Sequence, residues 1–243
     1  MLLSAILFLG CRPSPASGLP TLERLQVDQQ AGVTLDVPPE QGEPLRYLAL
    51  GDSYTVGEAV QKSNRWPNQL ASLLRDAGYE IEDPQIVARS GWTTDGLAAA
   101  LQQAEIVPPY DLVSVLIGAN NQFRGYSLES YSRELAALLE QSVAYAGNHP
   151  GRVLVLSIPD WSMTPVGSQF DRQMIAGEID AFNRVITREA ERLGVRFIDI
   201  TPISRNAESD PDLIAIDGLH PSGKMYAQWA ALAVKEIVLA LQE

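Results

Sequence analysis

Ser53 occupies a position typical of a serine nucleophile. In the stretch "RYLALGDSYTVGEAV", residues 46–60, a continuous apolar run leads directly into Gly51-Asp52-Ser53. Gly51 permits a sharp turn where a side chain would obstruct the chain. A hydroxyl is a poor nucleophile unless a neighbouring base takes its proton, and histidine is the usual base near neutral pH. The stretch therefore predicts a reactive serine if the rest of the chain supplies a base.

The chain has two histidines, and they stand in different contexts. His149 lies in "GNHPGR", a turn composition that predicts a solvated loop. His220 lies in "IDGLHPSGK", with Asp217 three residues before it. An Asp-x-x-His spacing can bring the carboxylate to the imidazole Nδ1-H, which fixes the tautomer and stabilises the imidazolium. For this pair taken alone, a hydrogen bond that only stabilises the loop is an equal alternative.

Acyl transfer also needs hydrogen-bond donors for the oxyanion of the tetrahedral intermediate. Gly91 in "RSGWTTD" offers a backbone N-H that no side chain shields, and Asn120 in "LIGANNQF" offers a neutral side-chain amide. The backbone N-H of Ser53 is a third donor. For each motif in isolation, a structural role is the alternative, because glycines permit tight turns and asparagines cap helices.

Strands and helices must bring these residues together. Five short apolar segments are typical of strands buried on both faces: residues 45–50, 85–88, 111–117, 152–158 and 195–200. Ser53, Gly91 and Asn120 each follow one of the first three segments. Because ligands bind beyond the carboxyl ends of parallel strands, we expect all three residues at one edge of the sheet.

Amphipathic helical patterns separate these strands. The one-face spacing of apolar residues predicts helices over residues 66–77, 131–139 and 175–193. A last helix is expected to begin at Ser222, its N-cap, and to turn Trp229 and Leu232 inward. The alternation of strands and helices predicts an α/β fold with right-handed crossovers and a parallel sheet covered on both faces.

The order of the motifs Gly-Asp-Ser, Ser-Gly, Gly-x-Asn and Asp-x-x-His resembles the SGNH, or GDSL-type, hydrolase family over about residues 46–221. This resemblance implies a three-layer αβα sandwich, flavodoxin-like, with a five-stranded parallel sheet, and neither a cofactor nor a metal. It also implies roles for individual residues: Ser53 as nucleophile and first oxyanion donor, Gly91 and Asn120 as further donors, His220 as general base, and Asp217 as its orienting carboxylate.

Two positions depart from the family pattern. The third motif commonly reads Gly-x-Asn-Asp, whereas this chain has Asn121 after Asn120, and the first motif has Tyr54 where leucine is common. We expect Tyr54 to alter the floor of the acyl pocket and Asn121 to alter the local support of Asn120, whose donor role survives. Both residues are also candidates for the substrate cleft. Trp92, after the oxyanion glycine, and Trp161, after the fourth strand, are further candidates for the cleft, with packing in the core or at the rim as the alternative.

Composition limits the class of partner. The 243-residue chain is 46% hydrophobic and 20% charged, with a formal net charge of -12. These values suit one globular domain, and the negative charge without a lysine-arginine cluster argues against a nucleic-acid partner. We expect a small-molecule, lipid or glycan ester as substrate, and the oligomeric state stays open.

The first residues predict a location. In "MLLSAILFLGC", residues 1–11, a short apolar run and a small residue precede Cys11, which resembles a bacterial lipoprotein signal with a lipidated cysteine. The segment lacks a basic start, and Phe8 stands where leucine is usual. Residues 12–44 have tether composition, and the hydrolase domain is expected over residues 45–243. We expect a lipid-anchored protein of the cell envelope, with a secreted or periplasmic protein as the alternative.

The sequence supports three alternative hypotheses of function. The leading hypothesis is a serine esterase that hydrolyses carboxylic esters, of lipids or of small acyl groups, through an acyl-enzyme on Ser53. The second is an acetylesterase or acyltransferase acting on cell-envelope carbohydrate with the same machinery. The third is a surface binding module on a hydrolase scaffold, because a fold alone does not establish function. The residues leave the acyl length and the alcohol open.

Overall fold

A computed structural model describes residues 43–240. Five parallel strands form one sheet in the order β2-β1-β3-β4-β5. The strands are β1 (Tyr47–Gly51), β2 (Gln85–Ala88), β3 (Leu112–Leu116), β4 (Val153–Leu156) and β5 (Arg196–Ile198). This order is that of flavodoxin-like folds. The five predicted strands and the parallel α/β sheet are therefore confirmed.

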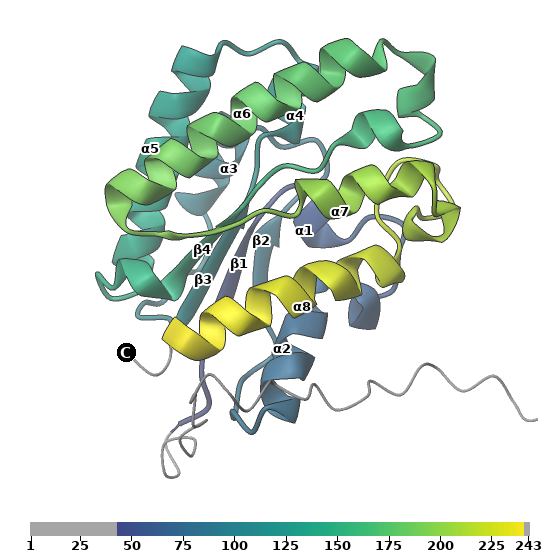
Figure 1. The fold of residues 1–243 in the computed structure, drawn as a ribbon. Coiled ribbons are helices and arrows are strands. Elements are labelled where there is room, and N and C mark those ends of the chain that lie inside the picture. Colours follow the sequence, from purple (N-terminus) through teal and green to yellow (C-terminus); the bar gives the residue numbers. More distant parts are fainter. Residues whose placement is uncertain (1–42, 241–243) are drawn as a thin grey trace, which may run out of the picture. The chain divides into compact units, whose positions relative to one another are not determined.

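Helices cover both faces of this sheet (Figure 1). α2 and α8 pack together on one face, while α3, α5 and α6 lie on the other. The α-helices are α1 (Ser53–Val56), α2 (Trp66–Asp76), α3 (Thr94–Leu101), α4 (Ala119–Phe123), α5 (Leu128–Tyr145), α6 (Arg172–Leu193), α7 (Thr201–Arg205) and α8 (Gly223–Ala240). Short 3-10 turns are η1 (Lys62–Asn64), η2 (Pro150–Arg152), η3 (Trp161–Met163), η4 (Gly167–Gln169), η5 (Asn206–Glu208) and η6 (Pro211–Leu213).

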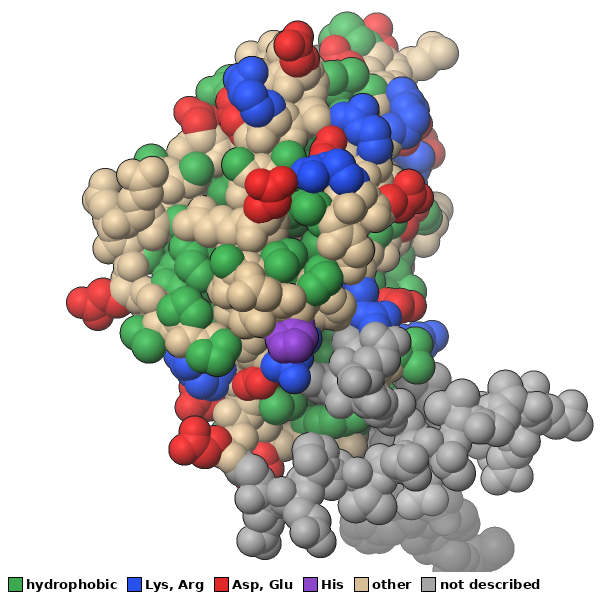
Figure 2. Space-filling model, turned by 90° about the vertical axis from the view of Figure 1, so that its left-hand side faces the viewer, with side chains coloured by type: hydrophobic (Ala, Val, Ile, Leu, Met, Phe, Trp, Pro, Cys, Tyr) green, Lys and Arg blue, Asp and Glu red, His purple; other side chains and the backbone are tan. Residues whose placement is uncertain are grey.

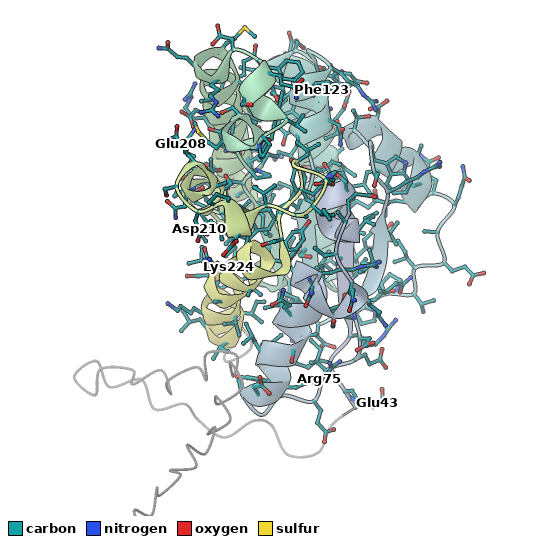
Figure 3. The ribbon with its side chains drawn as sticks, turned by 90° about the vertical axis from the view of Figure 1, so that its right-hand side faces the viewer. Glu43, Arg75, Phe123, Glu208, Asp210 and Lys224 are labelled. Carbon is teal, nitrogen blue, oxygen red and sulfur yellow. The ribbon has the colours of Figure 1, made fainter. Side chains whose placement is uncertain are left out.

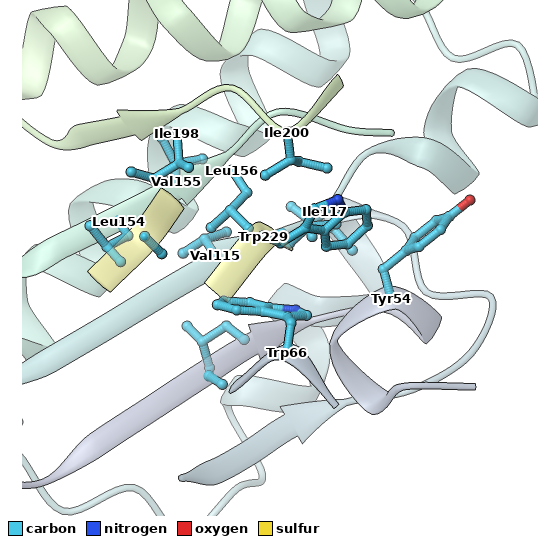
Figure 4. Packing of buried hydrophobic residues seen from close by; sticks show 14 of the residues in the cluster. Tyr54, Trp66, Val115, Ile117, Leu154, Val155, Leu156, Ile198, Ile200 and Trp229 are labelled. Atoms are coloured by element: carbon cyan, nitrogen blue, oxygen red, sulfur yellow. The ribbon is translucent and has the colours of Figure 1, made fainter. Parts of the chain in front are cut away.

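The centre of the sheet is apolar on both faces. Every residue of β1, β3 and β4 is buried, whereas the edge strands β2 and β5 are partly exposed. Figure 4 shows how Trp66 of α2 and Trp229 of α8 pack beside the strands. The ring of Tyr54 lies 6.3 Å from the Trp229 ring, centroid to centroid. The core therefore extends to the residue that follows Ser53.

The last helix corrects one prediction. α8 begins after Ser222, whose Oγ accepts a hydrogen bond from the N-H of Met225 at 3.5 Å, as expected of an N-cap. Trp229 is buried, but Leu232 is 36% exposed, so its predicted inward position was wrong. α8 contacts the core through positions four residues apart, which include Met225, Trp229 and Ala233, and Leu232 lies beside that stripe.

The outer surface bears on membrane contact and on charge. Within residues 43–240, we find no helix that is long and apolar enough to span a bilayer. Acidic and basic side chains are interspersed on the face shown in Figure 2, which carries no continuous basic patch. Cys11, the predicted signal segment and nearly all of the predicted tether lie outside the described residues.

Candidate active site

Ser53 is the first residue of α1, directly beyond the carboxyl end of β1. The chain turns there because Gly51 has no side chain: a Cβ would clash with the Thr55 side chain and the Leu116 carbonyl oxygen. Asp52 caps α1, its Oδ1 accepting a hydrogen bond from the N-H of Tyr54 at 3.0 Å. A glycine and a helix cap thus fix the position of the serine.

His220 lies between Ser53 and Asp217. Its Nε2 is 3.0 Å from Ser53 Oγ, and its Nδ1 is 2.6 Å from Asp217 Oδ2. Asp217 Oδ1 also accepts hydrogen bonds from the N-H groups of Leu219 and His220, both at 3.0 Å. Partial burial raises the pKa of Asp217, but these hydrogen bonds outweigh it and hold the pKa below its ordinary value. The charged carboxylate therefore orients the imidazole with Nε2 toward the serine.

The loop that carries this pair is held at both ends. Ile214 and Pro221 form an antiparallel bridge across it, and the Ala215 N-H donates to the His220 carbonyl oxygen at 2.8 Å. The Asp-x-x-His spacing thus lies within one hydrogen-bonded turn that leads into α8. His149, in contrast, is exposed at the start of η2, as its turn composition predicted.

The three candidate oxyanion donors differ in their hydrogen bonds. Within the described chain, the N-H groups of Ser53 and Gly91 donate to no other residue. Gly91 has φ +83°, which favours glycine, and its carbonyl oxygen accepts from the Arg124 guanidinium at 2.7 Å. The Asn120 amide donates to Asp52 Oδ2 at 3.3 Å and to the Trp92 carbonyl oxygen at 3.1 Å. Since an amide has two N-H bonds, Asn120 must exchange a partner to reach an oxyanion.

Asp52 is the second carboxylate near Ser53. It is fully buried, and no basic side chain of residues 43–240 forms an ion pair with it. Burial raises its pKa to about 7, although the hydrogen bonds from the Tyr54 N-H and the Asn120 amide act in the opposite direction. Sequence reasoning treated this residue only as part of the serine motif.

A cavity of about 220 Å³ opens at the serine. Its polar end consists of Ser53, Tyr54, Asn120 and His220. The rest of its lining is apolar: Ala119, Phe123, Trp161, Val166, Phe170 and Leu219. The Tyr54 ring supports the histidine from one side, with ring centroids 5.5 Å apart. The site can thus bind an apolar group beside an activated hydroxyl.

Two of the four predicted cleft residues lie elsewhere. Tyr54 and Trp161 line the cavity, but Asn121 and Trp92 do not. Asn121 is fully buried and bonds twice to Thr94, accepting from its N-H at 3.1 Å and donating to its hydroxyl at 2.7 Å. It joins α4 to the first turn of α3 and so supports the helix that carries Asn120. Trp92 packs against the core, and its carbonyl oxygen accepts a hydrogen bond from the Asn120 amide.

Apart from Trp161, sequence reasoning missed the aromatic and aliphatic wall of this cavity. Phe123 had one usable signal, because it follows Asn120 by one turn of α4. Phe170 and Val166 stand in or beside η4, where no periodic pattern marks them. Within residues 43–240, no cluster of three or more His, Cys, Asp or Glu side chains is arranged to hold a metal ion.

Comparisons with known proteins identify the family of this chain. The model of the GDSL-like lipase/acylhydrolase family matches residues 49–228. An arylesterase from Vibrio mimicus is 22% identical over 196 residues, which cover 79% of this chain and 88% of that protein. A structure of an acetyl xylan esterase from Geobacillus stearothermophilus is similar with a TM-score of 0.62 and 22% identity, over 81% of this chain and 95% of that one.

A third relative is a psychrotrophic esterase from Pseudoalteromonas sp., in a structure inhibited by monoethylphosphonate. It has a TM-score of 0.59 and 21% identity, over 82% of this chain and 99% of that one. At these identities the structural likeness concerns the fold, whereas the family model covers most of the chain, from β1 into α8. The chain therefore belongs to the GDSL-like lipase/acylhydrolase family.

Proposed function

We propose that the protein is a serine esterase that hydrolyses carboxylic esters through an acyl-enzyme on Ser53. The observation that carries this proposal is the continuous hydrogen-bonded chain from Ser53 Oγ through His220 to Asp217, with spacings of 3.0 and 2.6 Å. A hydroxyl within reach of an imidazole whose other nitrogen contacts a carboxylate is the arrangement that activates a serine nucleophile.

In the acylation step, Ser53 Oγ attacks the ester carbonyl carbon while His220 Nε2 takes its proton. The carbonyl oxygen becomes an oxyanion, for which the free N-H groups of Ser53 and Gly91 supply donors. The imidazolium is stabilised by Asp217, 2.6 Å from Nδ1. When the tetrahedral intermediate collapses, the bond to the alcohol oxygen breaks and His220 returns the proton to that oxygen.

In the deacylation step, water takes the place of the alcohol. His220 removes a proton from the water, whose oxygen attacks the acyl carbon, and the oxyanion occupies the same donors. Collapse then breaks the bond to Ser53 Oγ, which recovers its proton from His220. The acid leaves and the enzyme regains its starting state.

The test is the Ser53→Ala variant. We expect turnover of p-nitrophenyl butyrate to fall by about 10⁴-fold or more, with the fold retained, because triad deletions have this scale. Wild type should also react with one equivalent of p-nitrophenyl ethyl phosphonate, with a matching mass increase at Ser53. The variant should not react.

Ser209→Ala is the matched control, because Ser209 is exposed and its hydroxyl bonds only to the carbonyl oxygen of Asn206. It should keep wild-type turnover and phosphonate labelling. Equal turnover in wild type and Ser53→Ala would reject the proposed function.

For location, we propose that Cys11 is lipidated and tethers the enzyme to the cell envelope. The support is the apolar run with a small residue before Cys11, followed by a tether composition. Cells that express the full chain should incorporate labelled palmitate, and Cys11→Ser should abolish the label. Absence of label in the wild-type protein would favour a secreted or periplasmic enzyme.

A further inference from the structure

Three aromatic side chains form one wall of the active-site cavity. Trp161 contacts Phe170 edge to face, with ring centroids 5.4 Å apart, and Phe123 likewise at 5.7 Å. Phe123 and Phe170 also meet edge to face at 6.5 Å. We call Phe123, Trp161 and Phe170 the aromatic wall. The three residues come from α4, η3 and the end of η4, so separate elements converge to build it.

The aromatic wall has a fixed base and an exposed rim. Trp161 is buried, and its indole N-H donates to Gln122 Oε1 at 2.8 Å; Gln122 in turn donates to Glu178 at 2.7 Å. Phe123 is 61% exposed and Phe170 49% exposed. Figure 3 shows Phe123 at one end of the molecule. Large apolar side chains exposed together at the mouth of a cavity are typical of a surface that a ligand covers.

The chemistry of the cavity selects among ligands. Its polar side chains are those of the catalytic end, and the remaining lining residues carry no charged group. The one polar atom of the aromatic wall, the Trp161 indole nitrogen, already donates to Gln122. Such a lining suits an alkyl or aryl group, which loses only its contact with water, whereas it offers the hydroxyl groups of a sugar ring no polar side chain outside the catalytic end.

We propose that the aromatic wall is an acyl-binding subsite for an aryl group or an alkyl chain of about six to eight carbons. The size follows from the volume, because an apolar cavity of about 150 Å³ holds benzene and this one measures about 220 Å³. The proposal rests on the proposed function, since it names the substrate class of the same serine.

The reaction sequence assigns this subsite to the acid rather than to the alcohol. The acyl group stays bound to Ser53 through both half-reactions, so a walled cavity beside the serine holds it in place throughout. The alcohol must depart, and water must reach the same position next to His220 before deacylation. A cavity that retained the alcohol would hinder this exchange.

The experiment compares two ester series. In the first, p-nitrophenyl esters run from acetate to octanoate, so only the acyl group changes. In the second, phenyl acetate is compared with 1-naphthyl acetate, so only the alcohol changes. For wild type, we expect kcat/KM in the acyl series to rise up to hexanoate by about fourfold per methylene. This factor corresponds to full burial of each added methylene group.

Phe123→Ala and Phe170→Ala test the aromatic wall. Phe123 is 61% exposed and Phe170 49% exposed, so these variants should fold, as a thermal melt will verify. We expect the gain per methylene to fall below about twofold, because each change opens one side of the wall. The naphthyl-to-phenyl ratio, which reports on the alcohol group, should stay within about twofold of wild type. Leu239→Ala, which removes an exposed apolar side chain near the end of α8, is the matched control and should change neither series.

Each contrary outcome has its own meaning. A steep preference of wild type for acetate would overturn the proposal and favour acetylated carbohydrate. Variants that change the naphthyl-to-phenyl ratio but not the acyl series would also overturn it, because the wall would then hold the alcohol. Failure of the proposed function appears separately, as Ser53→Ala activity equal to that of wild type.

Discussion

Two carboxylates lie near Ser53, the proposed nucleophile, and their surroundings differ. Asp217 is partly exposed and accepts hydrogen bonds from the His220 ring and two backbone N-H groups, and its pKa is lowered. Asp52 is fully buried, accepts from one backbone N-H and the Asn120 amide, and has a pKa raised to about 7. The two side chains are chemically identical, so the number of donors and access to water account for the contrast.

This contrast assigns different tasks to the two residues. Asp217 stays charged throughout the working range and can stabilise the imidazolium on His220. Asp52 changes charge near neutral pH. It is linked to the site in two ways, because it caps α1, which begins at Ser53, and accepts a hydrogen bond from the Asn120 amide. We therefore expect Asp217 to serve the proposed base and Asp52 to position the proposed oxyanion donor.

Removing the charge of Asp217 should have the largest effect. In Asp217→Asn, the amide no longer stabilises the imidazolium and permits the wrong tautomer of His220, so we expect kcat to fall by about 10⁴-fold. Steady-state hydrolysis of p-nitrophenyl hexanoate measures it. Asp212→Asn, at a side chain that is 87% exposed, should behave as wild type. A loss smaller than tenfold for Asp217→Asn would show that His220 needs no carboxylate partner.

Removing the amide that joins Asp52 to the site should have the next largest effect. For Asn120→Ala, we expect kcat to fall by roughly 10²- to 10³-fold with KM little changed, because the amide acts on the tetrahedral intermediate. Asn206→Ala, at an exposed position, is the control. An unchanged rate would remove Asn120 from the oxyanion site and leave only the backbone donors.

The two carboxylates should affect the pH dependence of the free energy of unfolding in opposite directions. Between its ordinary pKa of 3.8 and about 7, Asp52 holds a proton in the folded state that it loses on unfolding. Its contribution is therefore fully present at low pH and is lost as pH rises to about 7. Between pH 5 and 8, this loss amounts to about 3 kcal/mol of the free energy of unfolding.

Urea unfolding of wild type and Asp52→Asn at pH 5 and 8 checks this value. In Asp52→Asn, the free energy of unfolding should not fall between pH 5 and 8, whereas in Asp217→Asn it should fall as it does in wild type. Because the pKa of Asp217 is lowered, its contribution is present above its ordinary pKa and is lost only as pH falls through the lowered value. Equal pH dependence in wild type and Asp52→Asn would mean that Asp52 is already charged at pH 5.

The smallest effect concerns the rate of Asp52→Asn. The new side chain can still cap α1 through its oxygen, but its amide faces the Asn120 amide, which loses a charged acceptor. We expect kcat to fall by about 10- to 100-fold, the scale of one hydrogen bond to a charged group. In the double variant with Asn120→Ala, the Asp52 change should add little, because both act through the same donor. Full additivity would contradict a positioning role for Asp52.

Much of the fold was predictable because its signals are local. Continuous apolar segments predicted all five strands, since strands buried on both faces carry little else. Short helices such as α4 and α7 escaped prediction, because five residues give no helical period. Leu232 shows the limit within a long helix: spacing identifies a stripe, but not which of its flanking residues the neighbouring elements cover.

The site was predictable only where motifs mark it. The four motifs name Ser53, Gly91, Asn120 and the Asp217-His220 pair, and their roles remain predictions that the variants above test. The aromatic wall depends on how η3 and η4 fold back toward α4, which no local pattern encodes. The two bonds of the Asn120 amide depend on the packing of β1 beside β3.

The helix α4 carries both the proposed oxyanion donor and part of the cavity wall. Asn120 and Phe123 lie one turn apart on five residues, and Asn121 anchors that segment to Thr94. A change that moves Phe123 therefore also moves Asn120. Phe170, directly after η4, shares no helix with Asn120. We therefore expect substitutions that alter substrate choice without loss of rate to be found more often at η4 than at α4. For engineering the enzyme toward new esters, η4 is the segment to randomise.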